Sequence, residues 1–326
     1  MNRSPTVPGN AVAAEPAFPK TREPKEFAQY LCDAYAKGAP PELLRADRKV
    51  WILALDHLIG MPRFDVARAM APLMASTFPR TNFFQTMVGL FDRVPEPNED
   101  SDFSGFRDDT SKEVQIVPRV GADTVLLGFC GLSHRLGIPI DLIHRWFGTV
   151  PVHVIYLRDY SKDNYDRGIK ALSQDMPSTI EALRSIISDL GAKRTVCLGV
   201  SMGTYGALRY ALELKADAVL AYAATTNLSP GWGNFGSFDR HNIRPGIDLR
   251  PLYDAAPSPP RVHLVYGEHH PFDRAQAINF LGLPTATFEI APDWADHSVV
   301  LHSIFHGRFD RLLQWLVDPQ IGTGAT

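Results

Sequence analysis

The stretch TVCLGVSMGTYG, residues 195–206, decides the fold of this chain. An apolar run reaches Gly199, Ser201 follows two residues later, and Gly203 comes two residues after the serine. The apolar run is typical of a buried strand, and the apolar spacing over 204–216 predicts a helix. Small residues on both sides of the serine let strand and helix pass closely, because a Cβ there would clash. An incidental serine in a glycine-rich loop is the alternative, but the strand, turn and helix in this order favour a nucleophile at Ser201.

Outward from this stretch, short apolar runs alternate with helical patterns through the second part of the chain. Strands separated by helices of this length predict an α/β protein with a mostly parallel sheet that is flanked by helices. The first two strands are expected to be neighbours, joined by a turn at 119–122. The predicted strands are 112–118, 123–129, 152–157, 194–200, 217–223, 261–267 and 286–292. The predicted helices are 139–148, 179–191, 204–216, 248–254, 272–282 and 298–316.

The first part of the chain has a different character, because apolar residues recur there at helical spacing and strand signals are scarce. Helices are predicted over 25–38, 41–59, 64–76 and 83–91. The chain is therefore divided into five parts. These are a disordered leader (1–22), a helical N-terminal region (23–94), an acidic linker (95–110), an α/β catalytic domain (111–318) and a tail (319–326).

Composition narrows the class of protein. The 326 residues are 45% hydrophobic and 21% charged, with a formal net charge of −3. Without a basic block, a nucleic-acid partner is not expected. The three cysteines, Cys32, Cys130 and Cys197, are too few and too far apart for a disulfide framework, and fit a reducing compartment. Residues 1–21 lack the apolar core of a signal peptide, and no apolar run is long enough to span a membrane. A cytoplasmic protein is expected.

A serine nucleophile needs a base, because its hydroxyl is weakly nucleophilic at neutral pH. When the serine lies on a strand-to-helix turn of this kind, an acid and then a histidine follow it along the chain. Three histidines follow the last predicted strand: His297, His302 and His306. His297 lies where the last helix begins, whereas the other two lie inside that helix. His297 is therefore the expected base.

The acid should follow the preceding strand, which ends in VYGEHHPFDRAQA. Asp273 and Glu268 are both candidates, and either carboxylate could hold the imidazole in one tautomer. Asp273 is favoured because it lies a few residues into the loop, and Glu268 stays open as the alternative. Asp293 and Asp296, on the loop of the histidine itself, are expected to cap the last helix.

An oxyanion hole needs two backbone N–H donors. One is expected from Met202, the residue after the nucleophile. The other is expected from the loop that follows strand 123–129, which contains Cys130, Gly131 and Leu132. Gly131 would let the backbone approach a substrate closely, and either Cys130 or Leu132 is expected to donate.

Three further residues are candidates for binding the substrate. Trp232 and Phe235 lie in an irregular segment after strand 217–223, where they could line an acyl or sugar pocket or simply fix the loop to the sheet. Arg158 follows strand 152–157 and could bind substrate, with a structural salt bridge as the alternative.

The motifs GVSMG, YGEHHPFD and the late DHS together resemble the α/β-hydrolase superfamily over about residues 110–317. The resemblance implies an eight-stranded type of sheet, a triad of Ser201, Asp273 and His297, and an acyl-enzyme intermediate. Two features depart from the pattern. His270 stands where the usual G-x-x-D acid motif has its aspartate, and FCGLSHRLG is not the HGGG loop of lipases.

These observations predict a serine hydrolase that cleaves an ester or thioester of a small-molecule or acylated substrate, without a cofactor or a metal ion. An acyltransferase or thioesterase that acts on a carrier or a saccharide would use the same residues. A third possibility is a catalytically idle scaffold that serves as a binding module. Residues 23–93, outside the resemblance, are expected to cover the active site, to contact a partner protein or to form a homodimer.

Overall fold

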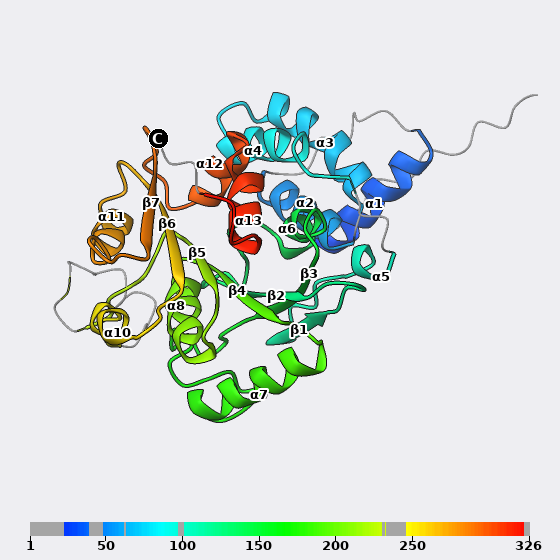
Figure 1. Ribbon diagram of the computed structural model, residues 1–326. Helices are drawn as coiled ribbons and strands as arrows, with labels where there is room; N and C mark the ends of the chain where they lie inside the picture. The colour runs from blue at the N-terminus through cyan, green and yellow to red at the C-terminus, as the bar shows by residue number, and fades with distance from the viewer. Residues whose placement is uncertain are drawn as a thin grey trace, which may run out of the picture. The chain divides into compact units, whose positions relative to one another are not determined.

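The computed structural model describes residues 23–38, 48–61, 63–96, 101–229, 232 and 246–322 (Figure 1). The chain divides into two compact units, with the boundary between Phe91 and Asp92. They are called the helical unit and the sheet unit below. Among the described helices, none combines the length and the apolar character that crossing a membrane requires.

The helical unit contains four helices in its described part, near the four predicted positions. Trp51 is fully buried and meets the Phe27 ring edge-on, with 4.8 Å between ring centroids. It therefore belongs to the core of this unit. The residues 41–47 of the predicted second helix lie outside the described residues. The helices are α1 Pro24–Ala36, α2 Arg48–Gly60, α3 Phe64–Thr77 and α4 Asn82–Phe91.

The sheet unit is built on seven strands in the order β1-β3-β2-β4-β5-β6-β7. Only β1 runs antiparallel to its neighbour, so the prediction of a mostly parallel sheet is confirmed. Among the described residues the sheet has one strand fewer than the eight that the resemblance implies. The strands are β1 Val114–Val117, β2 Thr124–Phe129, β3 Val152–Leu157, β4 Arg194–Val200, β5 Ala218–Tyr222, β6 Arg261–Gly267 and β7 Ala286–Ala291.

Helices cover both faces of this sheet. Figure 1 shows α7 (Met176–Asp189) and α8 (Met202–Leu214) on one face, and α6 (Ile140–Phe147) and α13 (Arg308–Val317) on the other. All residues of β2, β3 and β5 are buried, because apolar side chains leave these central strands on both sides. Because both faces of the central strands are buried, these strands hold the loops at their carboxyl ends in defined positions.

The predicted pairing of the first two strands is wrong. β1 pairs with β3, and β3 lies between β1 and β2. The turn at 119–122 crosses the start of β3, where the His153 ring accepts the Arg119 N–H at Nδ1 and donates from Nε2 to Ala122 O, each at 3.0 Å. The connection from β1 to β2 therefore passes the end of β3, which lies between them, and the His153 side chain of β3 bonds both ends of that connection.

The last helix and the acidic linker also differ from their predicted forms. The predicted helix 298–316 is two helices, α12 Val299–Phe305 and α13, because Gly307 adopts φ 63° and ends the first one. Within the expected linker (95–110), a short helix α5 (Ser101–Ser104) lies in the sheet unit, and Phe103 stacks on His144 with 4.3 Å between ring centroids. The described part of this segment therefore packs within the sheet unit.

Candidate active site

Ser201 sits on a strained turn between β4 and α8. Its backbone has φ 55° and ψ −125°, which a residue with a side chain seldom adopts. A Cβ at Gly199 would lie 2.6 Å from Thr204 Cα, and a Cβ at Gly203 would fall on the carbonyl oxygen of Phe129. Both glycines therefore allow the close packing of strand and helix that the turn requires. The geometry is that of a nucleophile elbow.

The structure brings Ser201, His297 and Asp273 into one hydrogen-bonded chain. His297 Nε2 lies 2.7 Å from Ser201 Oγ, and His297 Nδ1 lies 2.9 Å and 3.0 Å from the two carboxylate oxygens of Asp273. Because a carboxylate can only accept, Nδ1 carries the hydrogen and Nε2 is free to accept the serine proton. His297 has 42% of its side chain exposed, whereas Asp273 is fully buried. His297, the partly exposed residue of the three, is the one placed to take a proton from Ser201.

The structure separates the two candidate acids by position. Asp273 lies in the first turn of α11 (Pro271–Ile278) and reaches His297. Glu268 comes directly off β6, is exposed, and accepts the Asp293 N–H at Oε2 at 3.0 Å. His302 on α12 stacks on His306, the C-cap of that helix, with 4.1 Å between the ring centroids.

The loop after β2 lies directly against the elbow. A Cβ at Gly131 would be 3.0 Å from Val200 O and 3.5 Å from Ser201 Cβ. Two N–H groups of this loop are already engaged, because Cys130 donates to Leu157 O and Gly131 donates to Arg135 O. Leu132 N–H donates to no carbonyl among the described residues. Of the three residues predicted for the oxyanion hole, Leu132 is thus the one whose N–H has no carbonyl partner in the described part of the chain.

Burial keeps the side chain of Cys130 from acting as a second nucleophile. The thiol is fully buried, and burial raises the pKa of Cys130 to about 12. Since the thiolate is the reactive form, this cysteine is inert near neutral pH. Cys197 is likewise buried in β4.

Arg158 is held in the interior rather than presented to a substrate. Its side chain is fully buried and forms an ion pair with Asp108. The other donors reach Lys112 O at 3.0 Å, the Gln115 side chain at 3.1 Å and His134 O at 3.2 Å. These contacts are those of the structural salt bridge, the alternative weighed for this residue.

The aromatic candidates are only partly placed. Trp232 is 37% exposed, and its backbone N–H donates to Ser229 O at 3.1 Å. Phe235 lies outside the described residues. A role of either residue in binding an acyl group or a sugar stays a prediction.

Two residues near Ser201 and Asp273 received no positioning role from the sequence. Tyr165, with φ 64°, donates its hydroxyl to Cys130 O at 2.8 Å and Leu157 O at 2.9 Å, and its ring fills the space beside Gly206. It supports the loop after β2 from below the elbow. His270 has Nδ1 3.0 Å from Asp273 Oδ1. The spacing H-x-x-D was the available signal, but it does not say that the two side chains turn toward each other.

Two groups of three side chains in the described residues have the spacing to hold a metal ion. In one, His270, Asp273 and His297, the ligating atoms are engaged with one another. In the other, Glu268, His269 and Asp293, all three are exposed, and such groups are common without an ion. We assign neither as a metal site.

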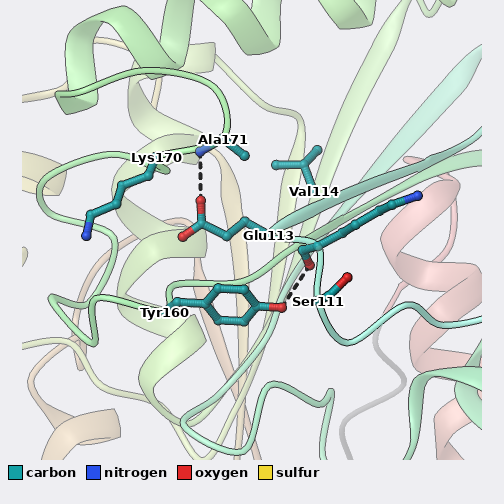
Figure 2. Close-up of a pocket in the computed structure, with 7 residues that line it drawn as sticks. Ser111, Glu113, Val114, Tyr160, Lys170 and Ala171 are labelled. Atoms are coloured by element: carbon teal, nitrogen blue, oxygen red, sulfur yellow. Dashed lines mark hydrogen bonds between the residues drawn. The ribbon is translucent and has the colours of Figure 1, made fainter.

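A pocket of about 550 Å³ lies beside β1, apart from the triad residues (Figure 2). Glu113 Oε2 accepts the Ala171 N–H at 2.7 Å, and the Tyr160 hydroxyl donates to Lys112 O at 3.1 Å. These two hydrogen bonds join the residues just before β1 to the segment that follows β3. The lining residues are Ser111, Lys112, Glu113, Val114, Tyr160, Lys170 and Ala171.

Comparisons with known proteins give structural likeness alone. No family model and no curated protein matches this chain. It is similar to an S-formylglutathione hydrolase from Agrobacterium tumefaciens, at 16% identity over 64% of this chain and 90% of that one, with a TM-score of 0.45. It is also similar to a lipase-esterase related protein from Clostridium acetobutylicum, at 11% identity over 63% of this chain and 100% of that one, with a TM-score of 0.45. A third similar structure is the capsule O-acetyltransferase of Neisseria meningitidis serogroup A, at 15% identity over 64% of this chain and 93% of that one, with a TM-score of 0.42.

The fold follows from the geometry of the chain itself. A mostly parallel sheet with helices on both faces carries a strained serine between β4 and α8. Asp273 follows β6 and His297 follows β7, which is the chain order of a carboxylate and a histidine in that architecture. The chain therefore has the α/β-hydrolase fold.

Proposed function

We propose that this protein is a serine hydrolase that cleaves an ester or thioester by acyl transfer to Ser201. The observation that carries the proposal is the 2.7 Å distance from Ser201 Oγ to His297 Nε2, with His297 Nδ1 held by Asp273. A serine in this position can be deprotonated as it attacks, because the base is already within hydrogen-bond reach.

In the first half of the reaction Ser201 Oγ attacks the carbonyl carbon and His297 Nε2 takes the hydroxyl proton. The tetrahedral intermediate carries a negative oxygen, and the adjacent Asp273 stabilises the imidazolium that has formed. The intermediate then collapses. The bond to the alcohol or thiol breaks, His297 gives its proton to that leaving group, and the acyl group stays on Ser201.

In the second half water replaces the leaving group. His297 takes a proton from water as the water oxygen attacks the acyl carbon, and a second tetrahedral intermediate forms. It collapses to release the carboxylic acid, and Ser201 Oγ regains its proton from His297. The exposed face of His297 supports this step because solvent reaches the base directly.

The oxyanion would be held by the N–H groups of Met202 and Leu132. Met202 is the first residue of α8, so its N–H has no partner within the helix. Leu132 supplies the second donor because its neighbours Cys130 and Gly131 already donate to carbonyls. Two donors at this place stabilise the charge that develops in the transition state.

Other parts of the proposal concern the setting of the enzyme. All three cysteines are free and buried, in line with the expected cytoplasmic location. The substrate is expected to be a small acylated molecule. A partner or homodimer contact through residues 23–93 stays a prediction.

A fluorophosphonate probe tests the nucleophile without knowledge of the substrate. The wild-type protein should be labelled, with the adduct on the peptide that contains Ser201, and Ser201→Ala should not. Ser178→Ala, at an exposed position on α7, is the matched control and should be labelled like the wild type. Equal labelling of wild type and Ser201→Ala would contradict the proposal, and no labelling of either would favour an idle scaffold.

A substrate screen separates hydrolysis from transfer. It would compare p-nitrophenyl esters of increasing chain length, a thioester and an acetylated sugar. Each would be assayed in water and with an added alcohol or thiol acceptor. Acid as the sole product supports a hydrolase, whereas an acylated acceptor formed in preference to the acid would indicate an acyltransferase.

A further inference from the structure

Two imidazoles contact the carboxylate of Asp273, one from the loop between β6 and α11 and one from the loop after β7. His270 Nδ1 lies 3.0 Å from Asp273 Oδ1, and His297 Nδ1 lies 2.9 Å from the same oxygen. The ring centroids of the two histidines are 5.2 Å apart. The side chain of Asp273 is fully buried, whereas 24% of the His270 side chain and 42% of the His297 side chain are exposed.

His270 can contact Asp273 in either of its protonation states. The Asp273 N–H lies 3.3 Å from His270 Nδ1, and neutral His270 accepts this bond as the N-cap of α11. Protonated His270 carries a hydrogen on Nδ1 and donates it to Asp273 Oδ1 instead. In both states the start of the helix and the carboxylate stay attached to one ring.

The charges around His270 favour its protonated state. Its hydrogen bond to Asp273 raises the pKa of His270 above the ordinary value, against the effect of burial. The titratable groups that face it are Asp273 on α11, and His297 and Asp296 on the loop after β7. When two imidazoles share one carboxylate at this distance, the first proton opposes the second.

We propose that His270 is a positioning residue of the triad, which shares the Asp273 carboxylate with His297 and, once protonated, opposes protonation of the general base. The inference rests on the proposed function for its catalytic meaning. Its consequence is directional. Because a second positive charge beside the first is unfavourable, we expect activity to persist further into the acid range than in a variant that lacks the His270 imidazole.

Substitution of His270 by asparagine isolates this effect. Asparagine keeps an acceptor for the Asp273 N–H at the N-cap, but it cannot be protonated. His269→Asn is the matched control, because the His269 side chain is exposed and its Nε2 lies 3.7 Å from Oδ1 of Asp293, a different carboxylate. Asp273→Asn tests the contact between His270 and Asp273 by changing the carboxylate instead of the imidazole.

The titration of the histidines is followed by NMR of proteins with labelled histidine, together with kcat/KM for p-nitrophenyl acetate against pH. In His270→Asn the midpoint of His297 should rise by about half a pH unit or more, because a neighbouring positive charge is gone. The acid limb of kcat/KM should move with it. His269→Asn should follow the wild type, and Asp273→Asn should lower the midpoint of His270.

Two results would overturn the inference. One is an unchanged His297 titration in His270→Asn. The other is an unchanged His270 titration in Asp273→Asn, which decides the matter even where the first variant does not fold. If the NMR shifts occur but the fluorophosphonate probe does not label Ser201, the two histidines are coupled while the proposed function, and with it the catalytic role of His270, fails.

Discussion

His297 Nε2 lies 2.7 Å from Ser201 Oγ, although 96 positions of the chain separate the two residues. They meet because β4 and β7 run parallel, so the loops after both strands leave the same edge of the sheet. Asp273 follows β6, which lies between β5 and β7, and reaches His297 from the neighbouring loop. The predictions below examine the parts of the molecule that make this meeting possible.

Replacement of the buried acid should have a much larger effect on activity than replacement of its exposed neighbour. Asp273→Asn should lower kcat by a factor on the order of 10³ to 10⁴, because an amide can donate to His297 and stabilise the wrong tautomer. Glu268→Gln should leave kcat within about twofold of the wild type by the same reasoning, since Glu268 is not placed on the imidazole. Ester hydrolysis measures both, and a large loss in Glu268→Gln alone would make Glu268 the acid.

Gly203, two positions after Ser201, should not tolerate a methyl group. A Cβ at Gly203 would lie 2.7 Å from Cys130 O and would fall on Phe129 O. Gly203→Ala should therefore destabilise the sheet unit by roughly 1–3 kcal/mol and slow fluorophosphonate labelling. Gly60→Ala is the control, because a Cβ there meets nothing within 4 Å. Thermal unfolding followed by circular dichroism compares the two, and a stable, fully reactive Gly203→Ala would contradict the tight elbow.

Arg158 should matter for stability rather than for substrate binding. Arg158→Met leaves the Asp108 carboxylate buried without its ion-pair partner, which typically costs about 3–5 kcal/mol. Arg167→Met is the control, since its ion pair with Asp163 is 3.7 Å long and 65% of the arginine side chain is exposed. Urea unfolding should separate the two variants. A normal unfolding midpoint with a raised KM in Arg158→Met would instead support a role in substrate recognition.

Asp141 should make stability depend on pH in the sense opposite to most carboxylates. Burial raises the pKa of Asp141 to about 6. The folded state then holds the proton more tightly than the unfolded state, so its stabilising effect is present at low pH and is lost as pH rises through 6. Asp141→Asn, which keeps an acceptor for the Asp108 N–H, should add about 1–3 kcal/mol at pH 8 and close to nothing below about pH 4.

Urea unfolding at several pH values measures this difference between wild type and Asp141→Asn. Asp175→Asn serves as a control of opposite sign, because hydrogen bonds from Ser178 lower the pKa of Asp175 at the N-cap of α7. Its wild-type carboxylate should help at neutral pH and lose that effect as the pH falls. A pH-independent gain in Asp141→Asn would show that repacking, and not ionisation, is responsible.

The local features of this protein could be predicted because they depend on neighbours in the sequence. The apolar run before Ser201, the glycines beside it and the helical spacing after it specify strand, turn and helix within some twenty residues. The alternation of strands and helices specifies a mostly parallel sheet in the same way. Both predictions were confirmed. The position of His297 after the last strand followed from chain order, and its assignment as the base stays a prediction.

Only the tertiary structure decided which groups meet across the chain. It placed β1 beside β3, and the His153 side chain bonds both ends of the turn that leaves β1. It left Leu132 with an available N–H, since Cys130 and Gly131 donate to carbonyls that no local pattern indicates. It turned His270 toward Asp273 at the start of α11. The amino-acid sequence specifies backbone shape over short ranges, but partners of buried polar groups depend on which segments packing brings together.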